Sequence, residues 1–273
     1  MTNAADWQGA VGRNWAAEFE RTDRSLSELN TVLVDRIAAW ARPDARILDI
    51  GCGAGATSFA LAERLPRAEV VGIDLSESLA LTARARNREA RVRFEIQDAT
   101  LWSGNDWRPD MLVSRHGVMF FDDPIAAFTH FAEVAALGAQ LVFSCFQDRA
   151  ENEWAVEIPA LLPAPPAPPQ PFAPGPFAFS DPDHVRNILG QAGWKNAHAE
   201  SVTFSYIAGA GDDAVADAVD FFSRIGPAAP LIRNLDVEEK NVFFERLSQK
   251  LCNHLVDGTV VFKAAAWIWS AHL

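Results

Sequence analysis

The stretch Ile47-Leu-Asp-Ile-Gly-Cys-Gly-Ala-Gly55 decides the expected fold. Its first four residues belong to a short apolar strand, 46–50. Its glycines form a turn into a helix that we predict from about Thr57 to Leu65. Glycine allows a sharp turn and a close backbone approach to a ligand, and the amino terminus of a helix offers unpaired N–H groups. The turn therefore predicts a ligand site, although similar turns serve many cofactors.

Strands and helices continue to alternate after this turn. Helices separate successive strands, as in a parallel sheet that is covered on both faces, and right-handed crossovers make such a sheet doubly wound. We therefore expect an α/β fold with a mostly parallel, seven-stranded, Rossmann-like sheet and helical cap insertions. The expected strands are 46–50, 69–74, 91–96, 110–114, 140–146, 198–206 and 260–270, and the helices between the early ones are 57–65, 77–89 and 124–136.

The chain divides into four predicted parts. Residues 1–45 form a helical segment with one amphipathic helix at 25–41, and residues 46–148 form the cofactor-binding core. Residues 149–180 are rich in proline, which prevents regular helix, and are either a surface linker or a semi-rigid flap. Residues 181–273 complete the sheet and carry a helical insertion at about 207–257, with helices at 212–225 and 237–255 and a further helix that Asp181 caps.

Composition limits the classes of function. The net charge is -12, so nucleic acid is repelled and is not expected as a partner. The cysteines, Cys52, Cys145 and Cys252, have no metal-site or disulfide spacing. No signal peptide and no apolar run of about 18 residues is visible, so we expect no membrane span and a cytoplasmic protein. A homodimer is compatible with the sequence.

Acidic residues follow the next two strands. Asp74 ends the second strand about twenty residues after the glycines, where a carboxylate can bind both hydroxyls of a ribose. It could instead cap the following helix, but Ser76 is the better cap. Asp98, in Gln97-Asp98-Ala99, follows the third strand and is interpreted either as a turn former or as a contact to an adenine ring.

With these motifs, residues 7–148 resemble the class I S-adenosylmethionine-dependent methyltransferases, and most of all the small-molecule branch that includes the quinone-biosynthesis enzymes. The resemblance implies S-adenosylmethionine as the cofactor and a small-molecule substrate. It implies that Gly51 and Gly53 wrap the methionine half, and that Trp15 lies in a segment that closes over the cofactor. The predicted cofactor-binding residues are Trp15, Asp49, Gly51, Cys52, Gly53, Thr57, Asp74, Leu75, Asp98, Ala99 and Ser114.

The reaction implied is an in-line methyl transfer, for which the protein aligns the reactants and excludes water. His116, after the fourth strand, is the candidate general base, with a hydrogen-bonded wall position as the alternative. The acids of Asp122-Asp123-Pro124 are better explained as a helix start than as metal ligands, so no metal is expected. An apolar or aromatic substrate is expected against Arg115, Met119, Phe120, Trp154, Phe177 and Phe222.

Other functions remain open at this point. A nicotinamide-dependent oxidoreductase would use the same glycine turn and Asp74. Its short-chain form needs a Tyr-x-x-x-Lys pair, and the only tyrosine, Tyr206, is followed four residues later by Ala210. A non-catalytic S-adenosylmethionine-binding protein on the same scaffold is the remaining alternative.

Overall fold

The computed structural model describes residues 4–166 and 170–273. Its centre is one eight-stranded sheet in the order β3-β2-β1-β4-β5-β8-β6, with the short β7 paired to β8 outside this path. Strands β1 to β5 run parallel, whereas β8 lies antiparallel between β5 and β6. The strands are β1 Arg46–Ile50, β2 Glu69–Asp74, β3 Val92–Ile96, β4 Met111–Arg115, β5 Gln140–Phe146, β6 Lys195–Gly209, β7 Leu255–Val256 and β8 Thr259–His272.

The predicted mixed, mostly parallel α/β sheet is confirmed, and the count of seven strands is corrected to eight. The eighth strand, β7, has only two residues, both exposed, and forms a tight hairpin with β8. A pair this short leaves no alternating apolar pattern in the sequence.

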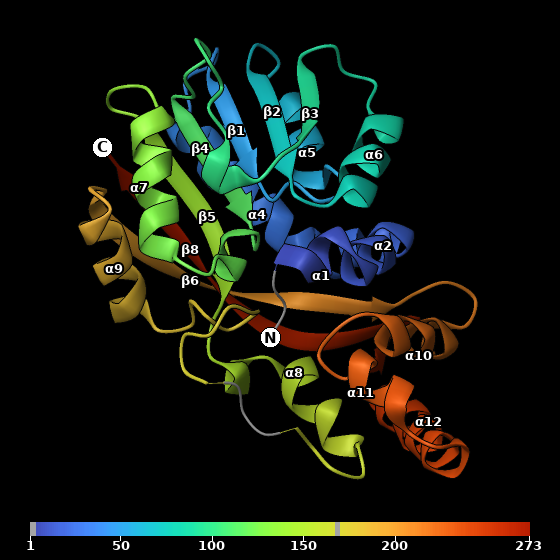
Figure 1. Ribbon diagram of the computed structural model, residues 1–273. Coiled ribbons are helices and arrows are strands. Elements are labelled where there is room, and N and C mark those ends of the chain that lie inside the picture. The colour runs from blue at the N-terminus through green and yellow to red at the C-terminus, as the bar shows by residue number, and fades with distance from the viewer. Residues whose placement is uncertain (1–3, 167–169) are drawn as a thin grey trace.

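Helices cover both faces of the sheet. Helices α4 and α5 pack together on one face, and α7 and α9 pack together on the other (Figure 1). The helices are α1 Ala4–Gln8, α2 Ala10–Ala17, α3 Phe19–Ser25, α4 Ser27–Trp40, α5 Ala56–Arg64, α6 Glu77–Arg86, α7 Pro124–Val134, α8 Glu153–Glu157, α9 Pro182–Gln191, α10 Ala214–Arg224, α11 Ala229–Asn234 and α12 Val237–Cys252, with 3-10 turns η1 Ala99–Leu101, η2 Val118–Phe120, η3 Arg149–Glu151 and η4 Pro159–Leu161.

Two Asp-Pro pairs fix helix starts as the sequence predicts. The side chain of Asp123 accepts a hydrogen bond from the N–H of Ala126, and Asp181 accepts from the N–H groups of Asp183 and His184. Proline suits the first helical turn because its missing N–H would have no partner there. The Asp123 cap starts α7 directly after the loop that follows β4.

The amino-terminal helices and the carboxyl-terminal insertion differ from expectation. Three short helices, α1 to α3, precede α4, and they lie between the carboxyl ends of the parallel strands and the long β6–β8 hairpin (Figure 1). The insertion holds three helices rather than two, because α11 follows a break at Gly226, whose φ is +97°. We call α1–α3 the cover and α10–α12 the cap.

The proline-rich segment contacts the rest of the chain. Residues 167–169 of the predicted flap lie outside the described residues. After them, the N–H of Gly175 donates to the carbonyl of Met119 at 3.1 Å. The ring of Phe177 packs 5.9 Å from Phe146 and 6.1 Å from Trp154, measured between centroids. The carboxyl-terminal end of the segment therefore packs against the β4 and β5 side of the sheet.

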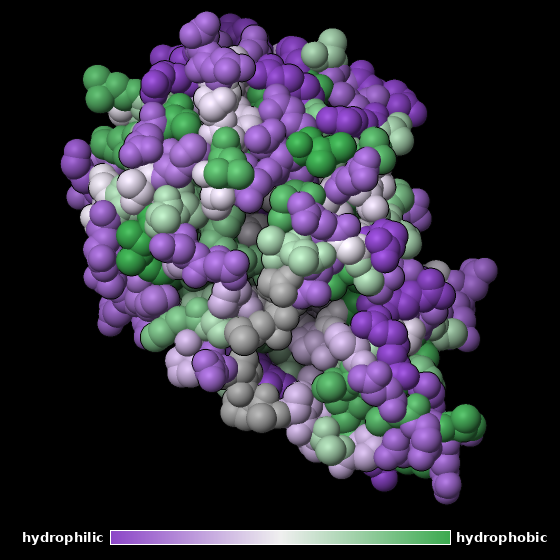
Figure 2. Space-filling model, in the orientation of Figure 1, coloured by the Kyte–Doolittle hydropathy of each residue, from purple (hydrophilic) through white to green (hydrophobic). Residues whose placement is uncertain are grey.

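The face of the molecule seen in Figure 2 is mainly polar. Figure 2 shows hydrophilic side chains over most of one face, with apolar side chains scattered among them. Within residues 4–166 and 170–273, no helix has the length and apolar character needed to cross a membrane.

Candidate cofactor and acceptor site

The glycine turn has one packed side and one open side. Gly51, Gly53 and Gly55 have φ values of +65°, +56° and +89°, a conformation that L side chains rarely adopt. A Cβ on Gly51 would lie 2.9 Å from the Cα of Gly117, so glycine lets the loops after β1 and β4 touch. A Cβ on Gly53 would meet nothing within 4 Å. The turn therefore leaves space beside Gly53 for a ligand.

Asp74 holds this turn to the end of β2. Its carboxylate accepts hydrogen bonds from the N–H of Gly53 and the N–H of Ser76, both at 2.8 Å. Burial raises the pKa of Asp74 to about 6, while the two N–H donors oppose that shift. The hydroxyl of Ser76 caps α6 by accepting from the N–H of Leu79, so the prediction that Ser76 is the helix cap is confirmed. Asp74 lies at the predicted cofactor edge with further lone pairs available.

Asp49 supplies a buried acceptor beneath the turn. It is fully buried on β1, and one carboxylate oxygen accepts from the hydroxyl of Ser58 at 2.6 Å. The other oxygen, Oδ1, has no hydrogen-bond partner among the described residues. Burial raises the pKa of Asp49 to about 6. A buried carboxylate oxygen without a partner is costly, so this site is suited to a donor on a ligand.

Asp98 lies beside exposed apolar side chains. Its Oδ1 accepts from the N–H and the hydroxyl of Thr100, which starts the turn η1 that contains Ala99. Ile96, which pairs with Asp74 in the sheet, is 38% exposed, and Leu101 is 71% exposed. Together with the half-buried Leu75 they leave apolar surface next to two acids. Neither Ile96 nor Leu101 carries a signal in the sequence that marks it as a site residue, because only exposure in the fold distinguishes them.

His116 has an unusual backbone and an unpaired ring nitrogen. Its φ is +64°, and its Nδ1 lies 2.7 Å from the hydroxyl of Ser144 on β5. Its Nε2 is buried and has no partner among the described residues. Burial, with a smaller contribution from the Arg115 charge, lowers the pKa of His116 to about 3. The imidazole of His116 is therefore neutral at physiological pH. The nearby Ser114, a predicted cofactor residue, instead has a structural contact, because its hydroxyl donates to the carbonyl of Ile50.

Aromatic rings extend from His116 into the cap. The ring of His116 lies 4.1 Å from that of Phe146, which lies 5.3 Å from that of Trp154. Trp154 and Phe222 then line a recess of about 10 Å³ between α8 and the cap. The predicted substrate residues Trp154, Phe177 and Phe222 are thus brought to one side of His116, and Met119 is buried nearby.

The cover adds a second aromatic group. Trp7 contacts Trp15 at 5.6 Å and Phe120 at 5.1 Å, both edge to face. Phe120 follows β4, so the predicted Trp15 and Phe120 are linked through Trp7. Two predicted cofactor residues are otherwise engaged: the hydroxyl of Thr57 donates to the side chain of Asn30, and Cys52 is buried in the core.

Ion pairs close the cover over the glycine turn. Asp23 of α3 pairs with Arg86 at 2.9 Å and with Arg115 at 3.3 Å. Arg86 also donates to the carbonyl of Ala54 within the turn at 2.7 Å. Gly12 allows close contact with α6, because a Cβ there would lie 2.2 Å from the hydroxyl oxygen of Ser76. The cover is therefore packed on Ser76, two residues after the predicted ribose ligand Asp74.

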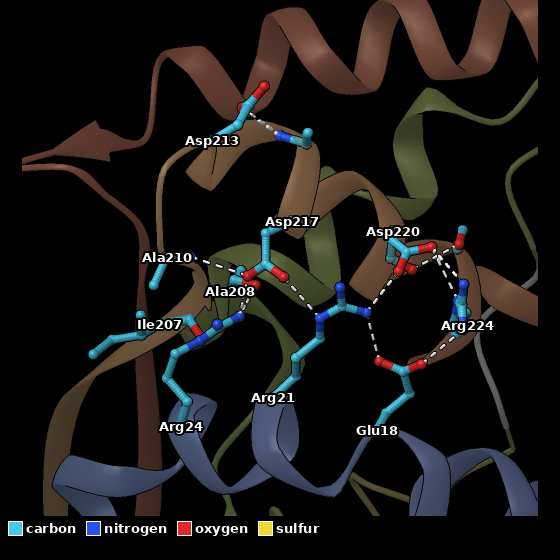
Figure 3. A network of polar contacts seen from close by, with 12 residues as sticks. Glu18, Arg21, Arg24, Ile207, Ala208, Ala210, Asp213, Asp217, Asp220 and Arg224 are labelled. Atoms are coloured by element: carbon cyan, nitrogen blue, oxygen red, sulfur yellow. Dashed lines mark hydrogen bonds and ion pairs between the residues drawn. The ribbon is translucent and has the colours of Figure 1, made fainter.

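A second set of ion pairs joins the cover to the cap (Figure 3). Arg21 pairs with Glu18, Asp217 and Asp220 at 2.6 to 2.7 Å, and Arg24 pairs with Asp217 at 2.7 Å. These contacts connect α3 and the preceding Glu18 with α10. Across the described part of the chain, no group of three or more His, Cys, Asp or Glu side chains is placed to hold a metal ion.

Comparison with known proteins adds to this geometry. Residues 47–138 match the family model described as a methyltransferase domain. They form a methyltransferase domain. The match begins in β1 and ends just before β5, so this methyltransferase domain contains the glycine turn, Asp74, Asp98 and His116.

The similarity to relatives and to solved structures extends beyond residues 47–138. Trans-aconitate 2-methyltransferase of Variovorax paradoxus is 34% identical over 147 residues, which are 54% of this chain and 52% of that protein. Ubiquinone biosynthesis O-methyltransferase of Hahella chejuensis is 33% identical over 53% of this chain and 60% of its own length. Phosphoethanolamine N-methyltransferase 2 of Haemonchus contortus, in complex with S-adenosyl-L-methionine, shares the fold with a TM-score of 0.59 and 14% identity over 100% of this chain and 60% of that one. The chain thus matches between half and three fifths of these curated relatives.

Proposed function

We propose that this protein transfers a methyl group from S-adenosylmethionine to a small, mainly apolar or aromatic organic molecule. The observation that carries this proposal is the site around the glycine turn. A Cβ on Gly53 would meet nothing within 4 Å, and the buried acid Asp74 accepts from the N–H of Gly53. A second buried acid, Asp49, keeps a carboxylate oxygen without a partner among the described residues. These residues lie in the part of the chain that matches a methyltransferase domain.

The strand order argues against a nicotinamide enzyme. The dinucleotide-binding fold has an all-parallel order 3-2-1-4-5-6. Here the final strand β8 runs antiparallel and is inserted between β5 and β6. The similar proteins described above are methyltransferases. They offer no support for the oxidoreductase alternative or for the non-catalytic alternative.

The residues present fit the cofactor. Asp49 and the turn at Gly53 would hold the methionine half, whose ammonium group is a donor for Asp49 Oδ1. Asp74 would accept from the ribose hydroxyls, and Asp98 with exposed Leu101 would bind the adenine. When bound, the cofactor supplies a methyl group on a positively charged sulfur, already activated for displacement.

The chain's own part in the reaction is to orient and to exclude water. The cover packs over the glycine turn, and the cap and Phe177 cover the side of His116. The proposed acceptor contacts are His116, Arg115, Met119, Phe120, Trp154, Phe177 and Phe222. In this proposal His116, the candidate general base, contacts the acceptor group of the substrate. The proposal includes a cytoplasmic location, no nucleic-acid partner because of the net charge of -12, and a single chain or a homodimer as the assembly.

Titration of the tryptophan fluorescence tests the cofactor assignment. S-adenosylhomocysteine should bind and NAD should not. Asp49→Asn and Asp74→Asn should each weaken binding by about tenfold or more, since hydrogen bonds to a charged group contribute about 1.5–3 kcal/mol. Asp35→Asn, at a surface ion pair with Arg64, is the matched control and should change nothing. Binding of NAD in preference to S-adenosylhomocysteine would refute the proposal.

A further inference from the structure

Two buried polar groups near β4 lack partners. His116 is 7% exposed and Trp154 is 5% exposed. His116 Nε2 and Trp154 Nε1 make no hydrogen bond to any described residue, and both rings contact Phe146. Leaving a buried polar atom unpaired costs about 1–3 kcal/mol. Such atoms are usually satisfied by water or by a ligand.

The hydrogen bond to Ser144 assigns the hydrogen on His116. Ser144 is fully buried, and its hydroxyl oxygen lies 2.7 Å from His116 Nδ1, its one side-chain contact among the described residues. A hydrogen on Nδ1 would leave the serine hydrogen without an acceptor and Nε2 without a donor. If the serine donates to Nδ1, the hydrogen lies on Nε2 and is the ring's unpaired donor. The second arrangement puts the hydrogen on Nε2, where it can donate to a ligand, and it is the arrangement that the inference uses.

We propose that His116 Nε2–H and Trp154 Nε1–H together bind the carboxylate of a planar, mainly apolar acid, and that an oxygen of this carboxylate accepts the methyl group. The inference deepens the proposed function and rests on it. Both groups are donors, and a carboxylate offers oxygens that only accept. Arg115, 14% exposed at the end of β4, adds positive charge beside His116.

The surroundings favour a flat apolar body behind the carboxylate. Trp154 stacks on Tyr206, with centroids 5.2 Å apart and planes 18° apart, and on Phe177 at 6.1 Å. The recess between Trp154 and Phe222 has a volume of about 10 Å³, which holds about one water. A planar acid is larger than this recess, so the proposal requires α10 and α11 to separate from Trp154 when the acid binds.

A carboxylate needs no general base. Carboxylic acids titrate near pH 4, so the acceptor is already an anion at neutral pH. One oxygen forms the new O–CH₃ bond while the S–CH₃ bond breaks, and the electron pair of that bond stays on the sulfur. The acid becomes a neutral methyl ester, the sulfonium becomes a neutral thioether, and no proton moves. A neutral His116 that donates from Nε2 is suited to this step.

The first test is the tautomer of His116. Nitrogen-15 NMR of the full chain, labelled at histidine, should show the Nε2–H form from pH 5 to pH 9. Ser144→Ala should broaden or shift this signal, since Nδ1 loses its donor. A hydrogen on Nδ1, with Nε2 bare, would overturn the inference and return His116 to the role of a base.

The second test measures ligand binding to the protein saturated with S-adenosylhomocysteine. trans-Cinnamate should bind at least about tenfold more tightly than cinnamyl alcohol, because hydrogen bonds to a charged group are stronger than those to a neutral one. Trp154→Phe keeps an aromatic ring but removes the N–H, and should weaken cinnamate binding by about tenfold without changing the affinity for the alcohol.

Trp194→Phe is the matched control. Trp194 is 3% exposed and its N–H already donates to the carbonyl of Phe128. This variant should lose stability and keep its affinity for cinnamate. If cinnamate and the alcohol bind equally, or Trp154→Phe binds cinnamate as wild type does, the inference fails while the proposed function stands. If S-adenosylhomocysteine itself does not bind, the proposed function fails.

Discussion

Glu18 and Arg224 are 206 positions apart in the sequence, and their side chains form an ion pair of 3.0 Å. Glu18 is only 5% exposed and also pairs with Arg21 at 2.7 Å. Its carboxylate therefore fastens the cover, which lies over the glycine turn, to helix α10 of the cap. This buried carboxylate adds to the ion pairs of Arg21 and Arg24 that join the cover to the cap.

Glu18→Ala should loosen this connection. The change leaves two arginine side chains short of a partner, and removing one member of a buried pair destabilises by about 3–5 kcal/mol. Because the arginines reach solvent, we expect a smaller loss of about 1–3 kcal/mol. The dissociation rate of S-adenosylhomocysteine, measured by stopped-flow fluorescence, should rise several-fold. Glu200→Ala, which removes an exposed partner of Arg36, should leave this rate unchanged.

Gly12→Ala should lift the cover from α6. Its Cβ would lie 2.1 Å from the carbonyl oxygen of Trp7 and 2.2 Å from the hydroxyl oxygen of Ser76. We expect weaker S-adenosylhomocysteine binding with little loss of sheet stability, measured by titration and thermal unfolding. Gly190→Ala in α9 is the control, since nothing lies within 4 Å of its Cβ, and it should stabilise by about 0.5–1 kcal/mol. Unchanged binding by Gly12→Ala would show that the cover does not close on the cofactor.

The glycines of the turn should separate binding from folding. Gly51→Ala would place its Cβ 2.9 Å from Gly117, so its main effect should be a lower Tm. Gly53→Ala meets no atom within 4 Å and costs only about 1–2 kcal/mol for its left-handed conformation. Its Cβ points into the proposed ligand space, so affinity should fall more than Tm. Equal effects of both variants on affinity would contradict this assignment.

Lowering the pH from 7 to 5 should weaken cofactor binding. The pKa values of Asp49 and Asp74 are raised to about 6, so at pH 5 roughly a tenth of each carboxyl remains charged. The affinity for S-adenosylhomocysteine should fall between pH 7 and pH 5 by up to about tenfold for each carboxylate that must be charged. Asp49→Asn should bind weakly with a flatter pH profile. A wild-type profile that is flat over this range would exclude a role for the charged carboxylates.

The same shifts affect the free energy of unfolding with the opposite sign. A carboxyl whose folded pKa is raised above its unfolded value favours the folded state below about pH 4, and this contribution is lost as the pH rises through 6. Asp49→Asn should therefore reduce the fall in stability between pH 4 and pH 7, as chemical denaturation at each pH would show. An unchanged fall would mean that the buried charge carries no such cost.

Much of the parallel half could be predicted because its signals are local. Runs such as Val70-Val71 mark buried strands, glycines mark the turn after β1, and Asp123-Pro124 marks a helix start. The ends of β1, β2 and β5 agree with the predicted residues. The identity of Ser76 as a cap also follows from local chemistry.

The remaining features depend on partners that are distant in the sequence. Nothing near Arg21 predicts a pairing with Asp217 or Asp220. Ile96 and Leu101 belong to apolar patterns that elsewhere mark core positions, and only the fold leaves them exposed. The short helix α11 was missed because Pro230 stands inside it, at a first-turn position where proline is tolerated.

The long β6–β8 hairpin has a consequence for how this protein can change. Its register runs from Lys195 paired with His272 to Gly209 paired with Val260, so the base of the hairpin is anchored beside β5 while its tip carries α10 to α12. Substitutions in the segment that connects the tips of β6 and β8 change the helices at the tip without disturbing the strand pairing at the base. Selection or an engineer can therefore replace that module, where we propose that the acceptor binds, and leave intact the half that we propose binds the methyl donor.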